Sequence, residues 1–179
     1  MKRSLVFALV ACVALVSMPA SAQLSLVKPI SIGIAGGGSL PMSDFADASN
    51  TGYNGTLVVA LKLPMIPVGL RLDGAYNAFG TKAVDGTMHV ASATGNITYN
   101  LPSIGVSPYV IAGAGMYSTV ASVEGLPSSD RSNDFGWNAG AGVKLPLLVF
   151  SAFVEARYNR VSVEGGSMQF VPVTFGIMF

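Results

Sequence analysis

Cysteine, histidine and charge are all scarce in this sequence, and each scarcity excludes a class of function. Cys12 and His89 are the only residues of their kinds, so the chain can form neither an internal disulfide nor a transition-metal site built from several such residues. Charged residues make up 11% of the chain, with a formal net charge of +1, whereas a nucleic-acid-binding surface needs a basic stripe. We therefore expect no cofactor and no nucleic-acid partner.

Long apolar runs are also missing after residue 22, although 51% of the chain is hydrophobic. A transmembrane helix needs roughly eighteen or more consecutive apolar residues, and no later stretch reaches that length. A hydrophobic chain of this kind can still satisfy its backbone in lipid if alternating strands close into a barrel.

The first 22 residues have the three parts of a secretory signal peptide. Lys2 and Arg3 form a positive start, residues 4–16 are apolar, and Ala20-Ser21-Ala22 has the small-x-small form of a cleavage site. We predict that residues 1–22 are cleaved, which leaves residues 23–179 as one domain with a formal charge of −1.

Residues 9–12 offer an alternative, because they resemble a lipoprotein box in which Cys12 would carry lipid. The apolar run continues past Cys12, as it does in an uninterrupted signal peptide. We favour cleavage at residue 22, which discards the cysteine.

The last ten residues alternate between large apolar side chains and smaller or more polar ones. Val171, Val173, Phe175, Ile177 and Phe179 share one parity, which is the period of a β-strand. Ten residues is also about the length of a strand tilted across a bilayer. We predict the closing strand of a membrane barrel here.

Leu-Pro pairs divide the chain at regular intervals. Leu63-Pro64, Leu101-Pro102 and Leu145-Pro146 each end a strand-like run, because proline cannot continue a ladder of hydrogen bonds. Longer polar stretches alternate with these pairs, at residues 41–54, 80–87, 120–134 and 161–167. Three turns and four loops connect eight strands, predicted at residues 29–39, 54–63, 67–79, 88–101, 107–119, 135–145, 149–160 and 169–179. The predicted fold is all-β: an eight-stranded antiparallel up-and-down transmembrane β-barrel with short periplasmic turns and longer extracellular loops.

The parity of the charged residues predicts which face of each strand meets lipid. The strand charges alternate with large apolar residues, so the apolar set is expected to face outward. The clearest of these outward residues are Leu57, Leu61, Leu70, Trp137 and Phe175. A soluble lipocalin-like barrel is the rival fold, and it would reverse this facing.

Four charges in the predicted strands stand in two pairs. Arg71 lies two residues from Asp73 in the third strand, and Arg157 lies two residues from Glu155 in the seventh. These strands are diametrically opposed in an eight-stranded barrel, so we predict a buried four-charge network across the lumen. Such a network would plug the barrel; the alternative is a proton or small-ion path.

Two segments and the terminal phenylalanine carry a resemblance to a known family. Residues 108–115 (PYVIAGAG), residues 136–144 (GWNAGAGVK) and Phe179 are similar to the small eight-stranded outer-membrane β-barrel family of the OmpA/OmpX/opacity-protein type. The resemblance spans residues 23–179 and implies a multi-pass location in the bacterial outer membrane, with anchoring, adhesive or resistance roles. It also implies that Phe175, Ile177 and Phe179 are the assembly signal read by the barrel-assembly machinery.

The sequence contains few residues that could form the catalytic site of an enzyme with this fold. Outer-membrane barrels that deacylate lipid A use a histidine with a serine and a carboxylate. Ser92 lies three residues from His89, so the two side chains are expected on opposite faces of a strand. Ser103, Ser118 or a loop serine remains open as a partner.

The loops hold most of the remaining charge. We interpret them as a rim that meets lipopolysaccharide, with a ligand or host-adhesion site as the alternative. The loop charges are Asp44, Asp47, Lys82, Asp85, Glu124, Asp130, Arg131, Asp134, Arg160 and Glu164.

These observations together predict a monomeric, non-enzymatic outer-membrane protein with a structural or surface-interaction role in adhesion or envelope integrity. A narrow or gated small-solute channel is the first alternative, and a lipid A-modifying hydrolase is the second. The expected partners are outer-membrane lipid and lipopolysaccharide, the assembly machinery and periplasmic chaperones, with an extracellular ligand at the loops as a further candidate.

Overall fold

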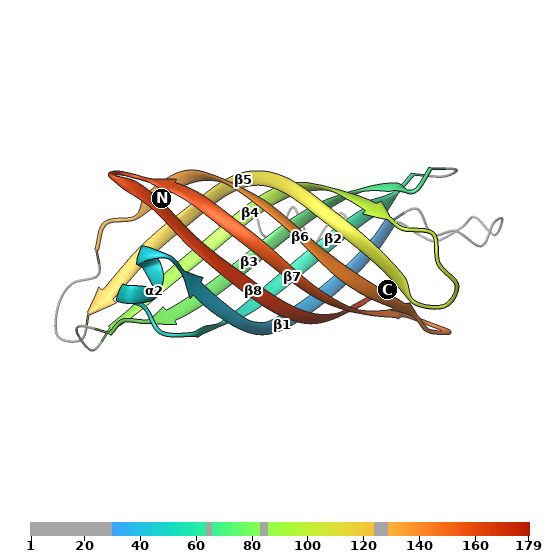
Figure 1. Ribbon diagram of the computed structural model, residues 1–179, viewed down its shortest axis with the longest axis horizontal. Coiled ribbons are helices and arrows are strands. Elements are labelled where there is room, and N and C mark those ends of the chain that lie inside the picture. Colours follow the sequence, from blue (N-terminus) through green and yellow to red (C-terminus); the bar gives the residue numbers. More distant parts are fainter. Residues whose placement is uncertain (1–29, 64–65, 83–85, 124–128) are drawn as a thin grey trace, which may run out of the picture.

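The computed structural model describes residues 30–63, 66–82, 86–123 and 129–179. Eight strands form a closed barrel in which each strand pairs antiparallel with the next and β1 pairs with β8 (Figure 1). The elements are β1 (Ile30–Met42), α2 (Asp44–Ala48), β2 (Gly52–Lys62), β3 (Val68–Gly80), β4 (Gly86–Asn100), β5 (Ser107–Val123), β6 (Ser132–Pro146), β7 (Ser151–Val163) and β8 (Gly166–Met178). The predicted fold is confirmed. The predicted signal peptide lies outside the described residues and stays a prediction.

Alternation along the strands separates the outer wall from the lumen. In β2, Leu57 is 64% exposed while its neighbour Val58 is 0% exposed. The five residues expected to face lipid are all exposed: Leu57, Leu61, Leu70, Trp137 and Phe175. Because the apolar residues cover the outside and every strand charge except Arg160 has the parity of the lumen residues, the wall has the polarity of a membrane barrel and not of a lipocalin. No helix in the described part of the chain is long and apolar enough to cross a membrane.

The two ends of the barrel differ. The turn end carries the connections at residues 63–67, 101–106 and 147–150, and the C-terminal Phe179 pairs there with Ile32 of β1. The loop end carries the other four connections, including the one that contains α2, at the left in Figure 1. In bacterial barrels the turn end faces the periplasm and the loop end faces outward.

Two loop predictions need correction. The expected loop at residues 161–167 is a tight turn at Glu164-Gly165, in which Gly165 adopts a φ of 80° that suits glycine. Serine is typical of loops, and this segment contains Ser162 and Ser167. However, Ser162 follows the fully buried Val161 and pairs with Ser167, so both serines continue the strand pattern.

The expected loop at residues 120–134 is also shorter than predicted. β5 continues to Val123 and β6 begins at Ser132, so Asp134 belongs to a strand and not to a loop. Serine and asparagine are tolerated in these strand ends because they pair across β5 and β6, as Ser118 does with Asn133.

Glycine makes room inside the narrow barrel at two places. A Cβ on Gly142 would overlap the ring of Tyr109, and a Cβ on Gly176 would overlap the ring of Phe153. Both aromatic side chains are buried in the lumen. The glycine-rich strands therefore allow large rings to fill the interior.

Candidate functional site in the barrel lumen

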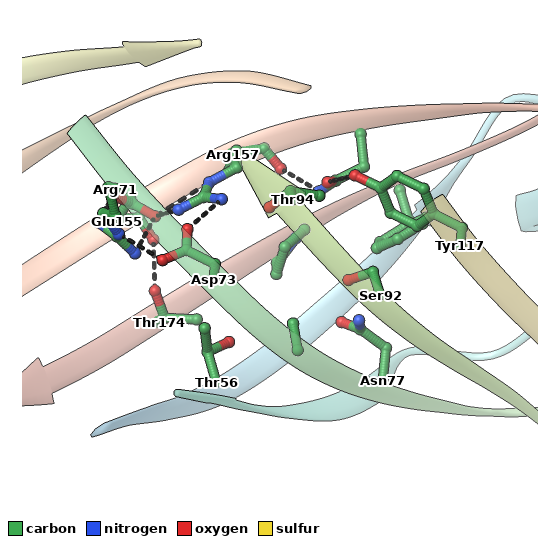
Figure 2. A pocket seen from close by; sticks show the side chains of 14 residues that line it. Thr56, Arg71, Asp73, Asn77, Ser92, Thr94, Tyr117, Glu155, Arg157 and Thr174 are labelled. Carbon is green, nitrogen blue, oxygen red and sulfur yellow. Dashed lines mark hydrogen bonds and ion pairs between the residues drawn. The ribbon is translucent and has the colours of Figure 1, made fainter. Parts of the chain in front are cut away.

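The lumen holds the four charged residues that the sequence singled out. Arg71 and Asp73 enter from β3, and Glu155 and Arg157 enter from the opposite side on β7 (Figure 2). All four residues are less than 9% exposed. Their inward direction follows from their parity, because each alternates with residues of the outer wall.

The four side chains form a closed cycle of ion pairs. Arg71 Nε lies 2.7 Å from Asp73 Oδ1, and Arg71 Nη1 lies 2.7 Å from Glu155 Oε2. Arg157 Nη1 lies 2.8 Å from Asp73 Oδ2, and Arg157 Nη2 pairs with Glu155 Oε1. Each guanidinium therefore bridges both carboxylates, and the cycle carries equal positive and negative charge. Such balance is what allows ions to be buried.

Neutral side chains complete the network. The Tyr109 hydroxyl donates to Glu155 Oε2 at 2.7 Å, and Asn96 Nδ2 donates to Asp73 Oδ2 at 3.1 Å. Sequence reasoning missed both residues. Asn96 was detectable in principle, because it is the cross-strand partner of Arg71, whereas the facing of Tyr109 was ambiguous in a strand of small residues.

An apolar cluster lies above the charges, toward the loop end. Its rings pack edge to face: centroids are 5.0 Å apart for Phe45 and Phe79, 5.5 Å for Phe79 and Phe170, and 6.5 Å for Tyr117 and Phe170. Val90, Val161 and Met168 complete this loop-end cluster. An ion crossing it would have to give up hydration among aromatic and aliphatic side chains, which is costly.

Phe45 of the loop-end cluster comes from α2, which the sequence analysis did not anticipate. The helix is fastened to the next loop, since Lys82 Nζ donates to the Ala46 carbonyl at 2.5 Å and the Lys82 amide donates to the Ala48 carbonyl at 2.9 Å. A single aromatic residue in an otherwise polar loop was the available signal. The first two loops thus form a cap with an apolar underside.

A second apolar cluster lies below the charges, toward the turn end. It consists of Val58, Phe153 and Met178. The Phe153 ring also lies beneath the Arg71 guanidinium, with 5.4 Å from Cζ to the ring centroid. The charged layer therefore has an apolar cluster on each side. On the turn-end side, Arg71 also borders a second cavity of about 30 Å³, which Lys62 and Lys144 help to line.

A cavity of about 30 Å³ adjoins the charged layer. It is lined mainly by polar side chains, including Asn77, Thr94 and Tyr117, which Figure 2 shows around it. One water molecule needs roughly 10–15 Å³ by this measure, so the space suits about two ordered waters. That volume is too small for a continuous aqueous path.

The other candidate residues lie outside the lumen or apart from one another. His89 is on the outer wall, where Nδ1 is 2.6 Å from the Tyr76 hydroxyl, while Ser92 lines the lumen cavity. The two thus face opposite sides, as expected. Phe175 and Phe179 are exposed on the outside, and their use as an assembly signal with Ile177 stays a prediction. No group of three His, Cys, Asp or Glu residues able to hold a metal occurs among the described residues.

Comparisons with solved structures agree with this architecture. Neisserial surface protein A (NspA) aligns with a TM-score of 0.70 and 15% identity, covering 84% of this chain and 96% of that one. Ail, the attachment invasion locus protein of Yersinia pestis, aligns with a TM-score of 0.55 and 19% identity, covering 86% and 100%. The outer membrane enzyme PagL aligns with a TM-score of 0.50 and 16% identity, covering 82% and 97%. Identities this low show a shared fold and no more.

The family assignment rests on the sequence itself. No curated protein sequence matches the chain. A family model described as "Outer membrane protein beta-barrel domain" matches residues 8–179. The chain therefore belongs to the outer membrane protein β-barrel domain family and is a multi-pass barrel of the bacterial outer membrane.

Proposed function

We propose that this protein is a closed, non-enzymatic barrel with a structural or surface-interaction role in envelope integrity or adhesion. The observation that carries the proposal is the filled lumen. A balanced cycle of buried charges lies between two apolar layers, with a cavity of about 30 Å³ beside it. A barrel filled in this way anchors a surface in the membrane better than it conducts solutes.

The alternative of a narrow channel has less support. A proton or ion path would need a chain of water or polar groups from one end to the other. The loop-end cluster interrupts such a chain with Phe79 and Phe170, which are at most 1% exposed. Phe45 of the α2 cap adds a third ring at the outer entrance.

The alternative of a lipid A hydrolase rests on His89 and on the likeness to PagL. His89 Nδ1 is engaged with the Tyr76 hydroxyl, and Ser92 lies on the other side of the wall. Nearby on the outer face, Ser118 is the cross-strand partner of Ala91, but no hydrogen bond joins its hydroxyl to His89 among the described residues. The names of two other neighbours, a surface protein and an attachment invasion locus protein, agree with a surface role.

Gene deletion with complementation tests the role. We expect the deletion strain to change in detergent, bile or serum sensitivity or in attachment to host cells, and both wild type and His89→Ala to restore it. The acylation of lipid A, measured by mass spectrometry, should be the same in all strains. If lipid A lost an acyl chain only in the strains with an intact His89, the hydrolase would replace this proposal.

A further inference from the structure

The outer wall carries one charged side chain within its described strands. Seven of the eight charges in the strands share the parity of the lumen residues: Lys62, Arg71, Asp73, Asp134, Lys144, Glu155 and Arg157. Arg160 has the opposite parity, because it is exposed between the buried Asn159 and Val161. A charge that faces lipid is costly at the bilayer midplane and is tolerated near the level of the headgroups.

Arg160 lies close to the loop end. It is three residues from the end of β7 at Val163, which is about 10 Å along the strand. Tyr158 lies two residues deeper on the same face, and its ring centroid is 5.6 Å from that of Trp137, the cross-strand partner of Arg160. Aromatic residues of this kind mark the interface of the apolar band, so the guanidinium lies at the level of lipid headgroups.

The guanidinium has no hydrogen bond or ion pair with another described residue. Its cross-strand neighbour Gln169 does not accept a hydrogen bond from it. The amide oxygen of Gln169 instead accepts from the Tyr158 hydroxyl at 2.8 Å and from Ser43 Oγ at 3.0 Å. The amide nitrogen of Gln169 donates to Ser167 Oγ at 2.9 Å. Arg160 thus projects from an ordered polar surface with all of its donors available.

We propose that Arg160 binds a phosphate of lipid A in the outer leaflet, with Trp137 beside it and Tyr158 below it packing against the lipid. A planar guanidinium can form two parallel hydrogen bonds to phosphate oxygens, which a lysine ammonium cannot do in the same geometry. The overall charge of the protein does not attract anionic lipid, so the binding is local to this side chain. The inference rests on the membrane location alone and is independent of the closed lumen.

The test compares Arg160→Gln with Arg131→Gln, which removes the same charge from an exposed loop residue at the same end. The folded barrel in detergent is titrated with bis-phosphorylated lipid A, and binding is followed by the shift in thermal unfolding. We expect wild type and Arg131→Gln to bind alike and Arg160→Gln to bind roughly tenfold more weakly. The affinity of Arg160→Lys for lipid A should lie between those of wild type and Arg160→Gln. This variant also keeps the test available if Arg160→Gln does not fold.

Two further ligands distinguish binding of a lipid A phosphate from binding of free phosphate. Dephosphorylated lipid A should bind all four proteins equally, and inorganic phosphate alone should not stabilise wild type. Equal affinity of wild type and Arg160→Gln for bis-phosphorylated lipid A would overturn the proposal. Stabilisation by inorganic phosphate equal to that by lipid A would overturn the assignment to lipid.

Discussion

Glu155 joins three side chains of the lumen, because its carboxylate accepts hydrogen bonds from Arg71, Arg157 and Tyr109. Its removal would leave two guanidiniums facing one carboxylate in a nearly dry space. Removing Glu155 together with Arg157 would leave Arg71 and Asp73, which already pair at 2.7 Å, as a neutral remainder. The network is therefore expected to respond to charge balance and not to the number of ion pairs.

Glu155→Ala should lower the free energy of unfolding by roughly 3–5 kcal/mol, because an uncompensated charge stays buried. The double variant Glu155→Ala/Arg157→Ala should lose less than the single variant, although it removes more contacts. Urea unfolding of the barrel in lipid vesicles, followed by tryptophan fluorescence, measures both. A double variant less stable than Glu155→Ala would show that the charges are hydrated and act separately.

Phe45→Ala should remove the aromatic contact between the α2 cap and the loop-end cluster. Truncation of a buried phenylalanine typically costs about 3 kcal/mol, and the amides of α2 should also lose protection against hydrogen exchange. Phe135→Ala is the matched control, since Phe135 is 58% exposed on the outer wall. Unchanged exchange in α2 after Phe45→Ala would mean that hydrogen bonds to Lys82, and not Phe45, hold the cap.

The single-residue predictions that succeeded rest on parity. Arg71, Asp73, Glu155 and Arg157 alternate with large apolar residues, so their facing was readable from the chain. Tyr109 and Phe45 were not, because apolar residues of both parities surround Tyr109 and Phe45 stands alone in a polar loop. Their positions depend on packing across the lumen, which no local pattern encodes.

At the scale of the elements, the outer wall should tolerate charge according to depth. Leu57 lies midway along β2, whereas Leu61 lies one residue from the end of that strand. Leu57→Arg should therefore cost about 3 kcal/mol and Leu61→Arg about 1 kcal/mol, because a side chain near the interface reaches water. Unfolding in vesicles checks this order, and equal costs at both positions would place the bilayer elsewhere on the barrel.

Strand number and direction were predictable from the Leu-Pro pairs and the alternation. The ends of the strands were not, as the β7–β8 turn shows: Ser162 and Ser167 pair with each other beyond the predicted strand ends. Polar residues indicate a loop when read singly, yet a strand that extends past the membrane into water has polar residues on its outer face. The length of such an extension is set by pairing with its neighbours.

At the scale of the whole molecule, the barrel has apolar layers at both ends of a charged layer. The loop-end cluster is closed by α2, and the turn-end cluster contains Phe153 and Met178. Neither layer alone distinguishes a plugged barrel from a gated one. The charge cycle between them pairs every one of its four ions within the cycle. The clusters and the cycle together predict a lumen that does not conduct ions.

Ion conductance of the wild-type barrel in a planar lipid bilayer tests this central claim most directly. With a wide porin as the positive control, we predict no discrete conductance steps from the wild-type protein in concentrated potassium chloride. Reproducible steps from wild type that Glu155→Ala abolishes would contradict the account, because the charge network would then be a path for ions and not a plug.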